Sequence, residues 1–136
     1  MKFTISWLKD HLDTNAKNQE ILETLTNLGL EVEESTDQSK ALQPFVVAEV
    51  QDVKKHPDAD KLQICGVNTG NKTIEVVCGA SNVRKGMKSV FADLGTIIPS
   101  TGDKITKVKI RGIYSHGMLC SARDLGLSED LSLIHI

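Results

Sequence analysis

Apolar and polar positions alternate with a helical period near the start of the chain. Ser6 is placed as an N-cap, and Trp7, Leu8, His11 and Leu12 fall together on one face of the helix that would follow. The pattern therefore predicts a short helix that carries the only Trp of the chain on its buried side.

A second helix is indicated more clearly after Asn18, the expected N-cap. Glu20 and Glu23 lie near the positive end of its dipole, and Gly29 can supply a left-handed stop. The apolar stripe of this helix consists of Ile21, Leu22, Leu25 and Leu28.

Beyond this helix the apolar positions change to a strand period. Residues 30–33 alternate as a short strand would, and the polar residues 35–39 resemble a linker, so we expect a boundary after residue 38. Further strands are predicted at residues 45–53, 61–69, 73–78, 87–92 and 104–110. Gly70-Asn71 has the composition of a tight hairpin turn, and one helical turn is expected at 121–125. About five short strands without a long helix predict a mainly β fold, a small barrel or sandwich.

The composition agrees with a small globular domain, because 40% of the 136 residues are hydrophobic. No apolar run approaches the roughly 18 residues needed to cross a bilayer, and Lys9 and Asp10 interrupt the segment where a signal peptide would be apolar. We therefore expect a cytoplasmic protein without membrane contact. The three cysteines form no Cys-x-x-Cys pair, and we expect Cys65, Cys78 and Cys120 to be reduced core residues.

The net charge of −2 hides a split between two regions of opposite sign. Residues 1–38 hold three Lys against eight acidic residues, a charge of −5, whereas residues 39–127 hold thirteen Lys and Arg against eight acidic residues, a charge of +5. A basic body is compatible with nucleic-acid contact, and equally with an ordinary solvated surface.

The basic residues are concentrated in a stretch of 28 residues, where only Asp93 and Asp103 oppose them. They are Arg84, Lys85, Lys88, Lys104, Lys107, Lys109 and Arg111. Aromatic residues for base stacking are scarce: Phe91 is expected in the core, and Tyr114 is the best exposed candidate. The combination favours recognition of a shaped RNA through phosphates and 2′-hydroxyls.

No common catalytic constellation is present, since the phosphate-binding glycine loops and a His-x-x-x-His zinc motif are both missing. The motif His56-Pro-Asp-Ala-Asp60 could be a metal or acid–base cluster, but we favour a turn between two strands in which the carboxylates cap backbone amides. Cys120 follows Ser115 and His116, yet no carboxylate is placed to orient the histidine. We expect no catalytic residue and no metal site.

Three motifs occur in the order of a known domain. They are His56-Pro-Asp-Ala-Asp-Lys-Leu62, Val77-Cys-Gly-Ala-Ser-Asn82 followed by Arg84 to Gly86, and Lys109-Ile-Arg-Gly112 followed by Ser115-His-Gly-Met-Leu-Cys-Ser121. Together they resemble the signatures of the tRNA-binding OB-fold domain. The opening Met1-Lys-Phe-Thr-Ile-Ser-Trp-Leu8 and the later Leu25 to Glu33 resemble the start of the bacterial phenylalanyl-tRNA synthetase beta subunit, whereas stand-alone tRNA-binding proteins lack such a front.

The resemblance implies three regions: a helical entry segment at 1–38, a five-stranded OB-fold-type barrel at 39–130, and a truncation tail without function at 131–136. It also implies a synthetase of two alpha and two beta subunits that joins phenylalanine to its tRNA with ATP and magnesium. The catalytic residues of that enzyme lie elsewhere, so this chain alone is expected to have no activity and no cofactor. In the family the opening segment packs against later residues, which would leave Trp7 and Leu8 partly exposed here.

The site residues implied by the resemblance would contact tRNA or help assembly. They are His56, Asp58, Lys61, Asn82, Arg84, Arg111, Ser115 and Met118, to which the basic stretch adds Lys85, Lys88, Lys107 and Lys109. The cations would contact phosphate, Asn82 and Ser115 would offer hydrogen bonds, and Met118 would pack beneath the surface. His116 departs from the family, which often carries an acid or another polar residue there.

Two other functions stay open. The barrel could be a structural module that packs the beta subunit together and touches no RNA. It could also be a stand-alone tRNA-binding or chaperone-like dimer, against which the helical front argues.

Overall fold

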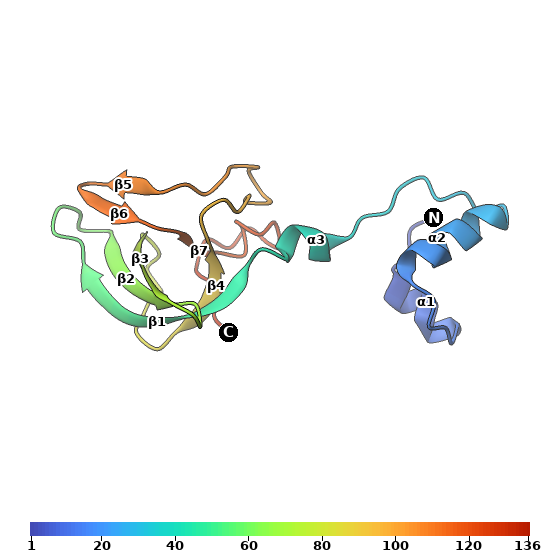
Figure 1. Ribbon diagram of the computed structural model, residues 1–136, viewed down its shortest axis with the longest axis horizontal. Helices are drawn as coiled ribbons and strands as arrows, with labels where there is room; N and C mark the ends of the chain where they lie inside the picture. The colour runs from blue at the N-terminus through green and yellow to red at the C-terminus, as the bar shows by residue number, and fades with distance from the viewer. The chain divides into compact units, whose positions relative to one another are not determined.

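The computed structural model describes residues 1–136, which divide into two compact units, Met1–Asp37 and Gln38–Ile136. The first unit is helical and is drawn in shades of blue in Figure 1. The second unit contains all the strands of the chain.

The first unit begins with helix α1, Ile5–His11, which has no buried residue. Its N-cap is Thr4, whose side chain accepts a hydrogen bond from the Trp7 amide at 3.1 Å, so the prediction of Ser6 as the cap was wrong by two positions. Trp7 is 56% exposed, so the prediction from periodicity that it is buried was wrong, and the partial exposure implied by the resemblance is confirmed. The reason is that a unit of this size buries little: Ile21 is its only buried hydrophobic residue.

Helix α2, Asn18–Asn27, starts one residue earlier than predicted, because Asn18 is its first helical residue and not its cap. Gly29 ends the helix as predicted, with φ of +92° and the Leu30 amide bonded to the Leu25 carbonyl at 2.9 Å. The strand predicted at 30–33 does not form, since no neighbouring strand offers it a partner.

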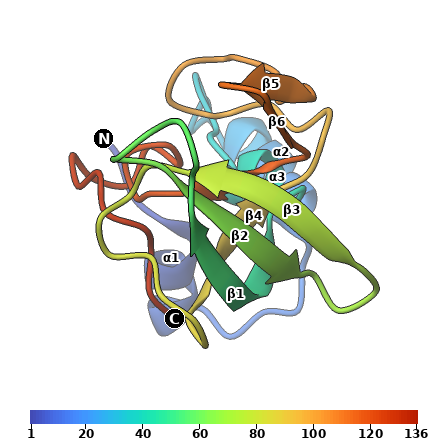
Figure 2. The ribbon, with the colours of Figure 1, turned by 90° about the vertical axis from the view of Figure 1, so that its left-hand side faces the viewer.

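The second unit opens with the short helix α3, Gln38–Leu42, which was not predicted and begins within the predicted linker at 35–39. The chain then continues into a five-stranded antiparallel sheet. The sheet order is β3-β2-β1-β4-β7. Its strands are β1 Val46–Lys55, β2 Gln63–Asn68, β3 Thr73–Cys78, β4 Lys88–Ala92 and β7 Met118–Cys120. The sheet is strongly curled, as Figure 2 shows, which confirms the predicted mainly β, OB-type architecture.

Strand β1 produces much of the curl, because it belongs to both halves of the sheet. Its first part, Val46 to Glu49, pairs with β4, and its later part pairs with β2. The register shifts between Val50 and Asp52, and such a bulge bends a strand and increases its twist. At this bend Val50 bonds to the β3–β4 loop, donating to the Met87 carbonyl and accepting from the Gly86 amide.

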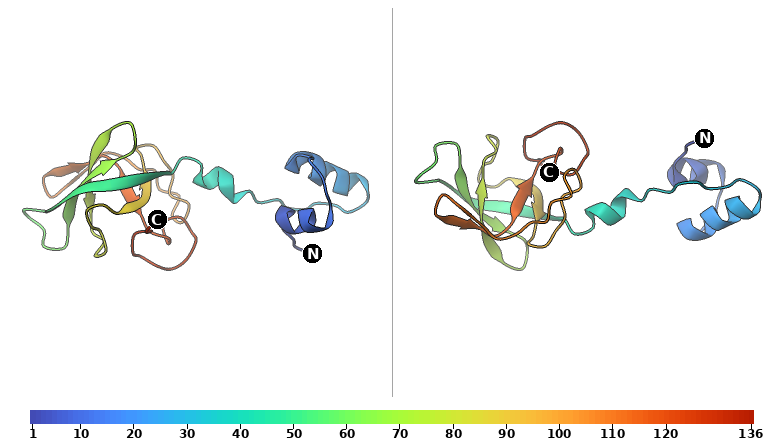
Figure 3. Two further views of the ribbon diagram at one scale, coloured as in Figure 1. Left: turned by 90° about the horizontal axis from the view of Figure 1, so that it is seen from below. Right: turned by 90° about the horizontal axis from the view of Figure 1, so that it is seen from above.

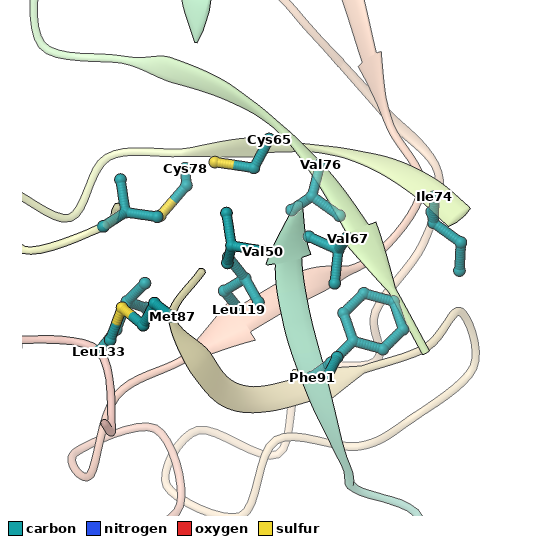
Figure 4. Packing of buried hydrophobic residues seen from close by; sticks show 12 residues of the cluster. Val50, Cys65, Val67, Ile74, Val76, Cys78, Met87, Phe91, Leu119 and Leu133 are labelled. Atoms are coloured by element: carbon teal, nitrogen blue, oxygen red, sulfur yellow. The ribbon is translucent and has the colours of Figure 1, made fainter. Parts of the chain in front are cut away.

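The core lies inside the curl, where alternate residues of the strands meet (Figure 4). Val50, Val67, Val76 and Phe91 are each 0% exposed. The three cysteines are free and buried, as predicted. Cys65 and Cys78 lie in this core, whereas Cys120 lies in a second buried cluster with Ala92, Ile98 and Leu125. Desolvation by burial raises the pKa of the Cys65 and Cys120 thiols to about 12, so neither is a thiolate at neutral pH.

The predicted strand at 104–110 is regular only over its last three residues. These form β5, Val108–Ile110, which pairs with β6, Ile113–Ser115, in a separate hairpin. Figures 1 and 3 show this hairpin at the same end of the domain as the loop between β1 and β2. Strands β6 and β7 escaped prediction because each has three residues and Gly117 stands between them.

Residues 131–136, which were expected to be a tail outside the barrel, pack onto it instead. Leu133 is 5% exposed within the main core, and its backbone forms a bridge with Ser121. The Ile136 amide also donates to the Lys88 carbonyl at 3.0 Å. The predicted turn at 121–125 is present, with the Leu125 amide 3.4 Å from the Ser121 carbonyl.

Candidate nucleic-acid interface

His56 connects the β1–β2 loop to the β5–β6 hairpin. The Asp58 amide lies 3.1 Å from His56 Nδ1, and because an amide can only donate, Nδ1 accepts. The proton of the neutral ring is therefore on Nε2, which donates to the Ile110 carbonyl at 3.0 Å. With 4% of its surface exposed, His56 supports the site from beneath and is not free to contact a ligand.

Arg111 makes the second connection between the same two segments. Its Nη1 donates to the Asp58 carbonyl at 3.1 Å. Arg111 and Gly112 form the hairpin turn with φ of +46° and +92°, the positive values that a type I′ turn requires. Arg111 and Lys61 remain exposed, each on one of the two segments that these hydrogen bonds join. The carboxylate capping predicted for this loop is replaced by His56 Nδ1 at the Asp58 amide.

The outer face of the hairpin carries Lys107, Lys109 and Tyr114. Lys109 is paired with Tyr114 across the two strands, and Lys107 lies two residues before Lys109, so the three side chains share a face. The Lys107 and Lys109 ammonium groups lie 4.5 and 5.4 Å from the centroid of the Tyr114 ring, within cation–π distance. Tyr114 was predicted as the best exposed candidate for base stacking but was not included among the site residues, and it is exposed here as predicted. The pairing of Lys109 with Tyr114 across the two-residue turn brings it beside the lysines.

The other predicted cations belong to a different segment. Arg84 and Lys85 lie in the β3–β4 loop, where Arg84 Nη2 is 3.2 Å from His135 Nε2. Lys88 lies on β4 directly opposite Glu49, whose carboxylate reduces the local positive charge. All three are exposed, but the structure does not bring them into contact with the hairpin cations.

Three motif residues turn inward and hold the barrel together. The Asn82 amide pairs with the Leu133 backbone, donating to its carbonyl at 3.0 Å and accepting from its amide at 2.9 Å. Ser115 is buried, accepts from the Val77 amide at 3.1 Å and donates to the Gly117 carbonyl at 3.0 Å. Met118 packs against the second buried cluster.

Neither a metal centre nor a nucleophile is assembled in this structure. No three His, Cys, Asp or Glu side chains are grouped so that they could hold a metal ion. Ser115 Oγ donates to a backbone carbonyl, and Cys120 is 0% exposed with its pKa raised by burial. A groove of about 320 Å³ between β3 and β7 is lined mainly by apolar residues and by none of the predicted cations. No helix is both long enough and apolar enough to span a membrane.

Comparison with known proteins identifies the family. The family model described as "Putative tRNA binding domain" matches residues 45–136. The phenylalanine–tRNA ligase beta subunit of Rhodospirillum rubrum is 55% identical over 130 residues, which are 96% of this chain and 16% of that protein. The corresponding subunits of Paramagnetospirillum magneticum and Rickettsia prowazekii are 53% and 52% identical over 130 residues, with the same coverage.

The chain thus spans about 16% of the length of these curated relatives. A solved structure of a MetRS-related protein from Pyrococcus horikoshii is 21% identical and covers 76% of this chain and 87% of that one, with a TM-score of 0.49. The family model matches two thirds of the chain, and the beta subunits align with nearly all of it. Both comparisons therefore indicate the same family. The chain belongs to the tRNA-binding domain family, and its relatives are the beta subunits of bacterial phenylalanine–tRNA ligases.

Proposed function

We propose that this chain is the part of a phenylalanine–tRNA ligase beta subunit that contacts tRNA directly, through the exposed cations of the β5–β6 hairpin and the adjoining loop. The complete enzyme would be a cytoplasmic assembly of two alpha and two beta subunits that joins phenylalanine to its tRNA with ATP and magnesium. Adenylate formation and transfer would use residues outside this chain, which contributes binding and orientation.

The observation that supports this proposal is the set of uncompensated cations on the hairpin. Lys107, Lys109 and Arg111 are exposed, and none of them takes part in the salt bridges of the barrel. Arg111 and Lys61 lie on two segments that His56 holds together. Exposed cations on a fixed scaffold gain affinity for a polyanion by releasing the counterions of its phosphates.

A second function is favoured by a different observation. Three of the motif residues form their hydrogen bonds within the domain: His56, Asn82 and Ser115. A motif used in this way is also compatible with a structural module that packs the beta subunit together and binds no RNA. The two functions differ in what they require of the hairpin cations.

Fluorescence anisotropy with bulk tRNA, and with an unstructured RNA of equal length, separates the two functions at several salt concentrations. The test variant is Lys107→Glu/Arg111→Glu. Lys85→Glu/Lys88→Glu changes the net charge equally in the other basic segment, and Lys9→Glu/Lys17→Glu does so in the helical unit. We expect only the hairpin variant to lose affinity strongly, with a salt slope reduced by about 0.7 to 0.9 for each phosphate contact removed.

An equal loss of tRNA affinity in all three variants would mean that binding depends only on the net charge of the chain. Absence of binding at low salt, with a normally folded protein, would instead leave the barrel as a structural module. A stable dimer in a solution mass measurement would favour the stand-alone alternative.

A further inference from the structure

We infer that the outer face of the β5–β6 hairpin binds one unpaired nucleotide of an RNA, with its base stacked on Tyr114 and its phosphate bound by Lys107 and Lys109. This inference rests on the proposed function and specifies which part of an RNA the hairpin takes. It gives Tyr114, which the sequence offered only as an exposed candidate for stacking, a defined place beside two phosphate-binding lysines.

Tyr114 is the one aromatic side chain of the barrel that is available for stacking. It is 46% exposed, whereas Phe91 is 0% exposed and Phe45 is half-buried against the second cluster. The remaining aromatic residues, Phe3 and Trp7, belong to the helical unit. A single platform accommodates a single base, which distinguishes this site from the rows of aromatics that bind long single strands.

Lys107 and Lys109 can leave the Tyr114 ring and bind a phosphate instead. At an exposed site, a cation–π contact is weaker than a charge-assisted hydrogen bond from an ammonium group to a phosphate oxygen. A phosphate that approaches the hairpin therefore draws Lys107 and Lys109 from their positions at 4.5 and 5.4 Å from the ring centroid. The same movement uncovers the Tyr114 ring for the base of that nucleotide.

The base must be unpaired because stacking requires a free π face. In a duplex both faces of each base are covered by neighbours, whereas bases in loops, bulges and ends are accessible. A folded RNA such as tRNA offers both phosphates and unpaired bases, so the hairpin can select an exposed nucleotide on a shaped molecule.

The backbone of the hairpin is held rigidly on the barrel, which fixes the two strands that carry the ring and the lysines. His56 bonds to Ile110 at one strand of the hairpin, and Arg111 bonds to the Asp58 carbonyl at the turn. On the other strand, the Val77 amide donates to Ser115 Oγ and the His116 amide donates to the Glu75 carbonyl at 3.0 Å. Binding therefore requires little additional ordering of the backbone.

The composition of the chain allows a direct test, because Tyr114 is its only tyrosine and Trp7 its only tryptophan. In a Trp7→Phe variant with unchanged tRNA affinity, tyrosine emission reports on the hairpin alone. The probes are an oligouridylate of about eight nucleotides, within the span of an OB fold, and a duplex RNA of the same length. Free tyrosine at the same RNA concentrations corrects for absorption by the RNA.

We expect the oligouridylate to quench Tyr114 strongly, and the duplex, which offers phosphates but no free base along its length, to change the emission much less. In the otherwise unaltered chain, Tyr114→Leu should weaken oligouridylate binding by about 5-fold to 150-fold, while Tyr114→Phe should retain it. Because Tyr114 is 46% exposed and belongs to neither buried cluster, both variants should fold.

The outcomes separate this inference from the proposed function. Equal quenching by the duplex and the oligouridylate, or full tRNA and oligouridylate affinity in Tyr114→Leu, would overturn the stacking site while leaving tRNA binding intact. If the unaltered chain bound neither tRNA nor oligouridylate at low salt, the proposed function would fail as well.

Discussion

His56 donates a hydrogen bond from Nε2 to the carbonyl of Ile110, 54 residues later in the chain, at 3.0 Å. The bond joins the loop after β1 to the hairpin that carries the candidate interface. His56 is itself buried, yet this bond fixes the relative position of the two segments that carry the exposed cations.

His56→Ala should destabilise the domain by about 1–3 kcal/mol, because the Asp58 amide and the Ile110 carbonyl both lose their partner. Urea unfolding measures the loss. Asp60→Asn is the matched control, since Asp60 lies in the same loop with an exposed side chain, and it should change stability by less than about 0.5 kcal/mol. Equal stability of the two variants would show that the bond does not support the loop.

Arg111→Gly should separate turn stability from RNA binding. The native φ of +46° is unfavourable for Arg and natural for Gly, which favours the variant, whereas the hydrogen bond from Arg111 Nη1 to the Asp58 carbonyl is lost. Because the two effects oppose each other, stability should change by less than about 1 kcal/mol. Loss of the cation should nevertheless weaken tRNA binding and lower the salt slope by about one phosphate contact. Thermal unfolding and anisotropy on the same sample measure both effects, and retained affinity would exclude Arg111 from the interface.

Gly117→Ala should disrupt the packing around Phe91. A Cβ at Gly117 would lie 2.4 Å from Phe91 Cζ and 2.9 Å from the Ala92 carbonyl oxygen, closer than atoms can approach. We expect a loss of about 1–3 kcal/mol or more, seen as a lower urea midpoint. Gly66→Ala is the control, because its nearest atom would be 3.7 Å away, and it should be tolerated.

Asn82→Ala should loosen the last residues of the chain. It removes both hydrogen bonds to the Leu133 backbone, and we expect a cost of about 1–3 kcal/mol. Native-state hydrogen exchange should show faster exchange of the Leu133 amide, ahead of the β1 and β2 amides. Asn82→Asp keeps the acceptor and loses the donor, so it should be intermediate; unchanged protection in both variants would contradict the proposed bond.

The buried thiols should make the domain sensitive to alkaline pH. The pKa of Cys65 and Cys120 is raised from 9.0 to about 12 in the folded state. A raised pKa contributes stability that is complete below the unfolded value and is lost as pH rises through the folded value. Unfolding free energy should therefore fall between pH 9 and 12. At pH 8 alkylation by iodoacetamide should follow global unfolding, and rapid labelling of folded protein would refute this.

The first three strands of the barrel could be predicted because their signals are local. Strand β3 was predicted with its observed bounds, and the Gly70-Asn71 turn before it forms with Gly70 at φ of +97°. Alternating burial along β2 and β3 matches the period-2 pattern in the sequence. Such elements follow from residue spacing and turn chemistry, with little help from the rest of the chain.

Whether Trp7 and residues 131–136 are buried depends on which parts of the chain pack beside them. Periodicity placed Trp7 on a buried face, but α1 has no buried residue. Residues 131–136 carry no strong motif, yet Leu133 enters the core because Asn82, 51 residues away, satisfies its backbone. Burial is a property of the neighbours as well as of the pattern.

For the candidate interface, residue types and their order were sufficient to predict a basic, tRNA-binding barrel with reduced cysteines in its core. Spacing alone could not reveal that His56 and Asn82 are internal supports, or that Tyr114 lies between two lysines on the outer face of a hairpin. Those roles come from contacts between segments more than 50 residues apart and from cross-strand register. Local sequence determines which elements can form, whereas long-range hydrogen bonds and packing decide which side chains remain free to bind RNA.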